Sequence, residues 1–268
     1  MFTTIINDCK DDNARGRQEC RVASLALGHV SFVGVESDLE AGMQLIDMLD
    51  ATEGRKGLIL VNVAPRGGHT RQWENGTPFG YFWYHETLVV ASVDGFVLSA
   101  VKDLGLLSEV ALLDTHTGSA AMAEAGFITP EAAARIPGTQ FRSFDFIPRA
   151  GLFLLAGTTL PSTALPLESV PALPPAIWHI DNFGNCKTTL RPEAFAPNTV
   201  TRYATLPFIK QLKDVPDATG ALTVGSSGIH DTRFVEAVIQ RGNFARTHEA
   251  HIGDDLFTTT SHFRKATS

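Results

Sequence analysis

Two short runs of apolar residues restrict the fold of this chain more than any other feature. The first is Leu58-Ile59-Leu60-Val61-Asn62-Val63, which Gly57 precedes, and the second is Leu88-Val89-Val90-Ala91-Ser92. Nearly continuous apolar runs of this length are typical of strands that are buried on both faces. Such strands occur in parallel sheets with helices on either side, so the two runs predict an α/β fold.

The segments before these runs alternate between strand and helix patterns. Residues 3–6 and 30–35 are short and rich in strand-forming side chains. Residues 39–49 repeat apolar side chains at helical spacing, behind Ser37 or Asp38 as the N-cap. The alternation predicts βαβ units around a central, mostly parallel sheet. The carboxyl ends of such strands share one edge, where ligands bind.

The character of the chain changes after residue 157. Residues 158–175 contain five prolines and a single charged residue, Glu168, and this composition predicts a semi-rigid linker. Beyond it, residues 177–180, 222–224 and 234–239 have short strand patterns separated by Gly, Asn and Asp. We therefore expect an α/β domain over residues 1–157 and a small antiparallel all-β, barrel-like domain over residues 176–268.

Composition and charge exclude several classes of protein. The chain has 268 residues, 44% of them hydrophobic, and a formal net charge of -7, whereas nucleic-acid binders usually carry a basic surplus. The amino terminus lacks a secretory pattern, and no apolar run is long enough to span a bilayer. Three cysteines without a CxxC pair fit a reducing compartment. We expect a cytoplasmic protein that binds neither nucleic acid nor membrane.

Two polar sites follow predicted strands of the α/β domain. The loop Ala64-Pro65-Arg66-Gly67-Gly68-His69-Thr70-Arg71 offers backbone amides and two arginines to an anion, although a tight surface turn explains it equally well. Asp8 directly follows the first strand. A carboxylate there accepts hydrogen bonds from a ribose diol, and it serves equally well as a helix cap or turn residue.

The all-β domain holds three further candidates. Ile180-Asp181-Asn182-Phe183-Gly184-Asn185 combines an acceptor, an aromatic face and an amide, which suit a purine and its sugar, but the same residues favour a β-turn. Ser226-Ser227-Gly228 forms either a turn or a cluster of donors. His248 and His251 have HxxH spacing without a third ligand nearby, so we expect an exposed polar loop and no metal site.

Taken in order, these segments resemble the S-adenosylmethionine hydroxide adenosyltransferases and the related fluorinases and chlorinases. The most specific match is Ile180-Asp181-Asn182-Phe183-Gly184-Asn185 with Thr188. The remaining matches span nearly the whole chain: Asn7-Asp8, residues 38–42, residues 63–71, Phe141-Arg142-Ser143-Phe144-Asp145, Ser226-Ser227-Gly228, Glu236, Gly242-Asn243 and Gly253-Asp254.

The resemblance implies a homotrimer that binds S-adenosyl-L-methionine (SAM) at subunit interfaces, between an N-terminal domain and a C-terminal domain. SAM would be a substrate or ligand, not a resident cofactor. By this analogy Asp8 would hold the ribose. The rest of the ligand would be surrounded by Asp181, Phe183, Asn185, Ser226 and Ser227.

The chain departs from the family at the catalytic positions. Ala64 stands where the hydrolases have Asp, and Arg142 stands where they have His, so that only Arg71 remains of the three. Ser143 fits a halogenase-like Phe-x-Ser pattern with Phe141. Arg71, Arg142 and Ser143 are therefore the candidate catalytic residues.

Three hypotheses follow for the activity. The first is cleavage of SAM at the ribose 5′ carbon by water, with Asn62, His69 or Asp145 orienting the water. The second is a catalytically silent or repurposed protein that binds SAM, adenosine or an anionic nucleoside, because Arg142 adds positive charge that repels a sulfonium. The third is adenosyl transfer to a halide.

Overall fold

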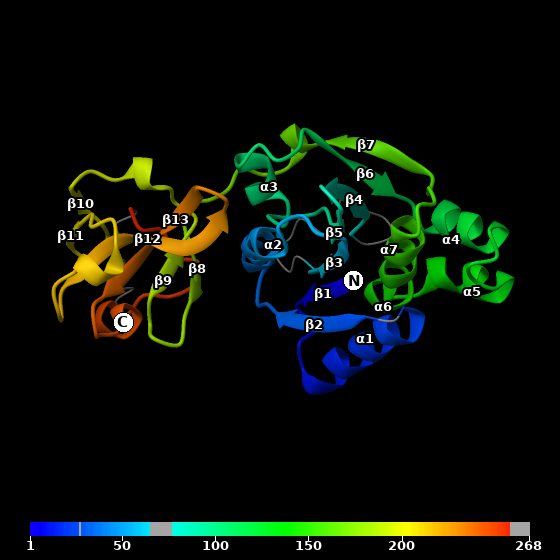
Figure 1. Cartoon of the computed structure of the whole chain (residues 1–268), viewed down its shortest axis with the longest axis horizontal. Coiled ribbons are helices and arrows are strands. Elements are labelled where there is room, and N and C mark those ends of the chain that lie inside the picture. Colours follow the sequence, from blue (N-terminus) through cyan, green and yellow to red (C-terminus); the bar gives the residue numbers. More distant parts are fainter. Residues whose placement is uncertain (27, 65–76, 258–268) are drawn as a thin grey trace, which may run out of the picture. The chain divides into compact units, whose positions relative to one another are not determined.

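The computed structural model describes residues 1–26, 28–64 and 77–257 (Figure 1). The chain divides into two compact units, Met1–Ala172 and Leu173–Ser268. The first unit is α/β and the second has an antiparallel all-β sheet, as the sequence predicts.

A mixed sheet forms the centre of the first unit. Within the described residues it has seven strands in the order β2-β1-β3-β5-β4-β6-β7. The pairings β2-β1, β1-β3 and β3-β5 are parallel, and the other three are antiparallel. The strands are β1 (Phe2–Asn7), β2 (His29–Gly34), β3 (Gly57–Asn62), β4 (Phe79–Tyr84), β5 (Thr87–Ser92), β6 (Glu109–Leu113) and β7 (Ser162–Pro166).

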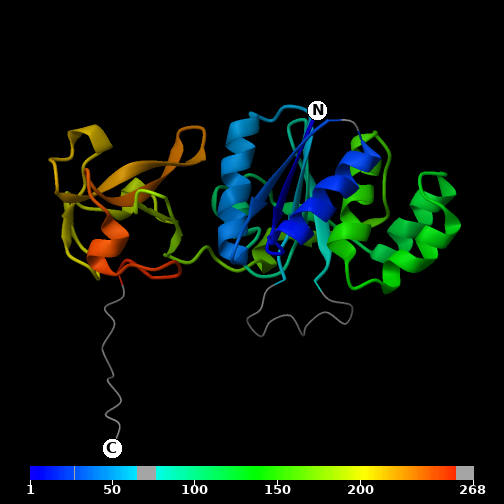
Figure 2. The same cartoon turned by 90° about the horizontal axis from the view of Figure 1, so that it is seen from below.

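Helices cover both faces of this sheet (Figure 2). On one face lie α1 (Asp12–Leu25) and α7 (Ile147–Leu155), and on the other lies α2 (Asp38–Thr52). Ser37 caps α2 through a 3.1 Å hydrogen bond from the Glu40 amide, as expected. The remaining helices of the unit are α3 (Ser99–Asp103), α4 (Thr115–Glu124), α5 (Pro130–Arg135), α6 (Arg142–Asp145) and the 3-10 turns η2 (Ile136–Gly138) and η3 (Leu167–Ser169).

Part of the predicted linker belongs to the first unit. Within residues 158–175, Ser162–Pro166 forms strand β7, which pairs along its length with β6. Proline suits this position because β7 is the edge strand of the sheet, where a missing amide donor leaves no ladder bond unmade. The expected linker was therefore too long, since the units divide between Ala172 and Leu173.

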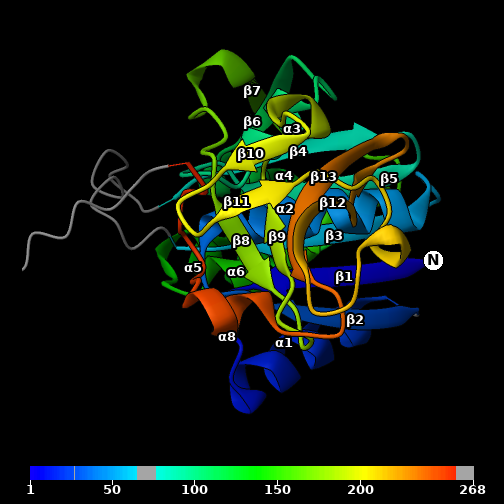
Figure 3. The same ribbon diagram turned by 90° about the vertical axis from the view of Figure 1, so that its left-hand side faces the viewer.

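The second unit contains two antiparallel sheets in its described residues (Figure 3). The larger has the order β12-β13-β9-β8, and the smaller pairs β10 with β11. Its elements are β8 (Ile177–Ile180), β9 (Cys186–Thr188), β10 (Asn198–Val200), β11 (Thr205–Pro207), β12 (Gly220–Ile229), β13 (Thr232–Ile239), α8 (Phe244–His248), η4 (Pro192–Ala194) and η5 (Leu212–Asp214). Ile177, Leu222, Val235 and Phe244 are among the buried residues of its core.

No helix among the described residues combines the length and the apolar character needed to cross a bilayer.

Two helical glycines provide a test of how tightly α2 packs. A β-carbon at Gly42 would lie 2.7 Å and 2.8 Å from the backbone oxygens of Phe96 and Val97, whereas one at Gly16 in α1 meets nothing within 4 Å. We predict that Gly42→Ala lowers the free energy of unfolding by about 1–3 kcal/mol through overpacking. Gly16→Ala should raise it by roughly 0.5–1 kcal/mol through helix propensity.

Urea unfolding of the two variants and the wild type measures the difference. A Gly42→Ala variant as stable as Gly16→Ala would contradict the close approach of α2 to the backbone of residues 96–97.

Candidate functional site

The parallel strands of the first unit end level with one another, as the sequence predicts. Asn7 at the end of β1 is in register with Asn62 at the end of β3 and Gly34 at the end of β2. Ser92 ends β5, and its hydroxyl lies 3.3 Å from the Val63 amide, which donates to it. This carboxyl edge therefore gathers polar groups from successive strands, which is the usual ligand-binding position in α/β sheets.

Asp8 lies at this edge and connects two strand ends. Its carboxylate accepts a 3.2 Å hydrogen bond from the amide of Ala64, and its own amide donates to the carbonyl of Asn62 at 3.3 Å. The helix cap that follows is Asp11, which accepts from the amides of Asn13 and Ala14. Asp8 is therefore not the cap of α1, and its half-buried carboxylate lies at the carboxyl edge of the sheet.

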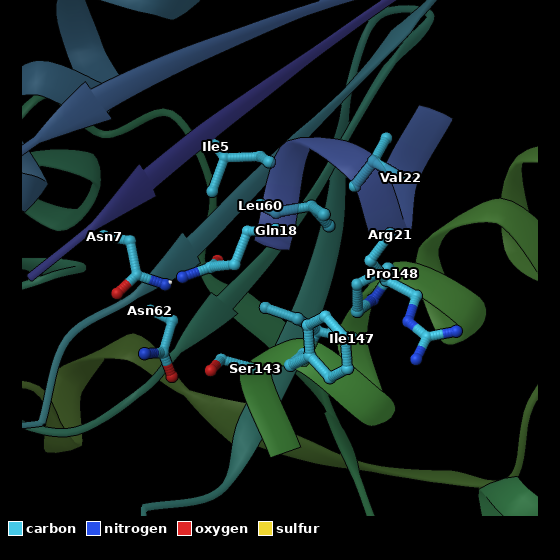
Figure 4. A pocket seen from close by; sticks show the side chains of 11 residues that line it. Ile5, Asn7, Gln18, Arg21, Val22, Leu60, Asn62, Ser143, Ile147 and Pro148 are labelled. Atoms are coloured by element: carbon cyan, nitrogen blue, oxygen red, sulfur yellow. Dashed lines mark hydrogen bonds between the residues drawn. The ribbon is translucent and has the colours of Figure 1, made fainter. Parts of the chain in front are cut away.

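Ser143 and Asn62 line a narrow pocket below the edge (Figure 4). Asn7 and Gln18 also line it, joined by a 2.9 Å hydrogen bond, while the rest of the lining is largely apolar. The side chains leave too little room between them even for a water molecule. This pocket is thus too small for an adenosyl group, although it brings Ser143 and Asn62 together.

Arg142 opens helix α6 and lies against the first residue of β4. Its guanidinium carbon is 5.6 Å from the centre of the Phe79 ring, and Phe79 pairs with Ser92 at the carboxyl edge. Half-burial of the side chain lowers the pKa of Arg142 from its ordinary value. Arg142 therefore places a partly desolvated positive charge at the same edge as Asp8.

Asp145 does not have the role expected for it. Its side chain is 6% exposed and is bound by Thr139 at 3.1 Å, Arg135 at 3.3 Å and Arg149 at 3.7 Å. Because these groups occupy the carboxylate, Asp145 is committed to an ion-pair network and does not orient water. The candidates Arg71 and His69 lie outside the described residues.

The segment from Asp181 to Asn185 is a turn built by the Asp181 carboxylate. One oxygen accepts from the amides of Phe183 at 2.8 Å and Asn185 at 2.9 Å, and the other accepts from the Asn185 side chain at 2.9 Å. Gly184 has a φ of 85°, a conformation that favours glycine. Asp181 and Asn185 are thus used within the turn, and the Phe183 ring is displayed at its surface, 67% exposed.

This turn is fixed against the start of α8. The Gly184 carbonyl accepts a 3.0 Å hydrogen bond from the Ala245 amide. A β-carbon at Gly184 would lie 2.1 Å from the side-chain carbon of Asn243, whose amide oxygen caps α8 by accepting from Arg246 at 2.7 Å. The backbone that carries Phe183 is therefore held from two sides.

Ser226 and Ser227 lie at an irregularity of β12, where the register with β13 shifts between Val224 and Gly228. The ammonium of Lys187 lies 3.1 Å and 3.0 Å from their two hydroxyl oxygens. Glu236, which faces Lys187 in register, accepts from the Ser226 amide at 3.0 Å. The two serines form a polar cluster with Lys187. We did not predict a role for this lysine, because its neighbours in the sequence indicate only a short strand.

The HxxH pair has two different environments. The ring of His248 packs 4.4 Å from that of Phe244, and burial lowers the pKa of His248. His251 instead lies 3.8 Å from Asp254. In the described part of the chain, no group of three or more His, Cys, Asp or Glu is placed to hold a metal ion.

The second unit is similar to a domain of a known family. Residues 175–257 match the model of the SAM hydroxide adenosyltransferase C-terminal domain. The matched segment contains the turn at Asp181 and the cluster at Ser226 and Ser227. The likeness is to one domain and covers less than a third of the chain.

Two solved structures share the fold over almost the whole chain. An uncharacterized conserved protein from Thermotoga maritima has 14% sequence identity and a TM-score of 0.65, with 95% of this chain and 98% of that chain covered. A conserved hypothetical protein from Thermus thermophilus has 17% identity and a TM-score of 0.56, with 94% and 96% covered. At these identities the likeness concerns the fold. No curated protein sequence matches this chain significantly.

Asp254, near the end of the matched segment, makes the stability of the second unit depend on pH. Its carboxylate accepts from the Tyr203 hydroxyl at 2.7 Å, Arg202 at 2.9 Å and the His251 amide at 2.8 Å. Burial raises its pKa, but these hydrogen bonds and the charge of Arg202 outweigh burial and lower it. The resulting stability is present above the unfolded pKa of about 3.9 and is lost as pH falls through the lower folded value.

We predict that Asp254→Asn is less stable than the wild type at pH 7 and that the difference shrinks below about pH 4. Urea unfolding from pH 7 to 2.5 measures it. Asp217→Asn is the matched control, because the ion pair of Asp217 with Arg241 is exposed on both sides and contributes little. A difference for Asp254→Asn that stays constant down to pH 2.5 would contradict the lowered pKa.

Proposed function

We propose that this chain binds SAM as a substrate and cleaves the bond between its sulfur and the ribose 5′ carbon, giving adenosine and methionine. One observation carries the proposal. In the segment that matches an adenosyltransferase domain, the turn at Asp181 holds a 67% exposed Phe183 ring on a fixed backbone.

The Phe183 ring suits an adenine face. A large aromatic side chain on the surface gains free energy when a flat ligand covers it, and stacking of a base on an aromatic ring contributes roughly 1–3 kcal/mol. Asp181 fixes the turn before a ligand arrives, so binding would not have to order this backbone. The hydroxyls of Ser226 and Ser227 and the ammonium of Lys187 add donors for the hydroxyl and carboxylate groups of SAM.

The first unit would supply the groups that act near the ribose. Asp8 offers an acceptor for the ribose diol at the carboxyl edge, with Arg142 and Ser143 at the same edge and Arg71 from the loop outside the described residues. In the reaction, water oxygen bonds to the 5′ carbon, the carbon–sulfur bond breaks with its electron pair going to sulfur, and the water proton passes to solvent. Asn62, at the end of β3 on the same edge, is the described candidate for orienting the water.

A sulfonium is a good leaving group, so positioning and desolvation of water provide much of the acceleration. The chain therefore does not need the Asp and His of the hydrolases to retain some activity. A homotrimer, which the family resemblance implies, is part of this proposal.

Silent binding of adenosine or an anionic nucleoside is the second candidate, and Arg142 is the observation that favours it. A half-buried guanidinium at the carboxyl edge opposes the positive sulfonium of SAM. S-adenosylhomocysteine has the same adenosyl group without that charge. A silent protein would bind S-adenosylhomocysteine or AMP more tightly than SAM and release no adenosine from SAM.

For binding, we predict that Phe183→Ala weakens the affinity for S-adenosylhomocysteine by about 10-fold to 100-fold, because the stacking surface is lost. The affinity of Phe183→Leu should lie between those of Phe183→Ala and the wild type, since leucine keeps apolar bulk without the aromatic face. Isothermal titration calorimetry measures the affinities. Val200→Ala is the matched control, because Val200 is an equally exposed apolar residue of the same unit at 74%. Equal affinity in Phe183→Ala and the wild type would rule out stacking on this ring.

For catalysis, we predict that the double variant Ala64→Asp, Arg142→His releases adenosine from SAM about 10²-fold to 10⁴-fold faster than the wild type, because it restores the acid–base pair of the hydrolases. Chromatography of the products against an enzyme-free blank measures both rates. A wild-type rate equal to the blank would leave silent binding as the function. An unchanged rate in the double variant would show that these two positions do not correspond to the catalytic ones.

A further inference from the structure

An arginine cluster lies on the helical side of the first unit, apart from the residues assigned to the adenosyl group. Arg21 comes from α1, Arg135 ends α5 and Arg149 lies in α7. Arg135 and Arg149 pair with the carboxylate of Asp145 in α6, and Arg21 lies close enough to Arg149 for the two charges to repel each other. The chain as a whole carries a net charge of -7. A local excess of positive charge on such a chain therefore calls for a specific explanation.

Asp145 neutralises only part of this charge. It lies 3.3 Å from Arg135 and 3.7 Å from Arg149, and its backbone carbonyl accepts from Arg149 at 2.6 Å. The Arg149 side chain is only 10% exposed. Burial lowers the pKa of Arg149, the like charges of Arg21 and Arg135 lower it further, and Asp145 acts in the opposite direction. The buried guanidinium of Arg149 is therefore repelled by both Arg21 and Arg135.

Arg21 adds a donor that is not used within the described structure. Its guanidinium carbon lies 4.3 Å from the centre of the Phe144 ring, which fixes the side chain by a cation–π contact. Its Nε atom is buried and has no hydrogen-bond partner among the described residues. Figure 4 shows the guanidinium turned away from Asn7 and Asn62. Burying a guanidinium N–H without a partner costs free energy, so an acceptor belongs there.

The charges determine the kind of acceptor. Three guanidiniums and one carboxylate leave two positive charges, and the exposed Arg17, 5.0 Å from Phe144, adds another at the rim. A phosphate group carries close to two negative charges at pH 7 and accepts bidentate hydrogen bonds from arginine. We propose that Arg21, Arg135 and Arg149 form a binding site for a phosphate-type dianion, in which Asp145 positions Arg135 and Arg149. This site does not depend on the proposed adenosyl chemistry.

Titration of the full chain with inorganic phosphate, at an ionic strength held constant with sodium chloride, tests the site. The wild type should show a saturable rise in melting temperature and measurable binding by calorimetry. Arg135→Gln, whose side chain is 57% exposed and so tolerates the change, should weaken the affinity at least ten-fold, as should Arg21→Met. Arg15→Gln is the control on α1, because Arg15 is paired with Glu19, and its affinity should equal that of the wild type.

Titration of the Phe183→Ala variant with AMP and with adenosine distinguishes a nucleotide phosphate from the free phosphate ion. AMP binding that is lost in Arg135→Gln, without binding of adenosine, supports a nucleotide phosphate, whereas binding of inorganic phosphate alone supports the free ion. The proposal is overturned if phosphate has no saturable effect on the wild type, or if the effect persists in Arg135→Gln and Arg21→Met, which would indicate an adventitious ion only. Binding of hexaglutamate but not phosphate would also overturn it in favour of an acidic protein segment.

Discussion

The second unit depends on one carboxylate for the surface that we assign to the adenosyl group. Asp181 accepts hydrogen bonds from two backbone amides and one side-chain amide of its own turn. These bonds, together with the positive φ of Gly184, leave the Phe183 ring outside the core. Asp181, which we expected to touch the ligand, is used within the turn, and in our proposal it serves the ligand by holding Phe183 in place. Under this proposal the turn and the binding surface, which the sequence presents as alternatives, form one structure.

Much of the fold could be predicted because burial leaves a clear pattern. The apolar runs that become β3 and β5 are buried along nearly their whole length, and helix α2 begins behind Ser37. Strand β4 was missed because its hairpin to β5 turns through His85 and Glu86, which lack the usual turn signals. Strand β7 was missed because prolines at an edge strand resemble a linker. In addition, β7 pairs with β6, which lies far from it in the sequence, and local sequence patterns do not reveal such pairing.

The edge that carries Asp8 and Asn62 was predictable from the sequence, but the contacts of other candidate residues were not. The level ends of β1 and β3 follow from parallel pairing, so the edge at Asp8 and Asn62 could be anticipated. Lys187 could not, because its contact with Ser226 and Ser227 crosses from β9 to β12 over the intervening strand β13. The ion pairs of Asp145 were not predictable for a similar reason, since its arginine partners come from separate helices. Arg142 is the residue that most distinguishes the two proposed functions. Its positive charge at the carboxyl edge opposes the sulfonium of SAM and favours an anionic nucleoside.

The account rests on the Phe183 ring as the platform for an adenine. The most direct test is a crystal structure of the full chain grown with S-adenosylhomocysteine at saturating concentration. The account predicts electron density for an adenine stacked on Phe183, next to the turn that Asp181 holds. Density for the nucleoside elsewhere in the protein, with the Phe183 ring still facing solvent, would contradict it.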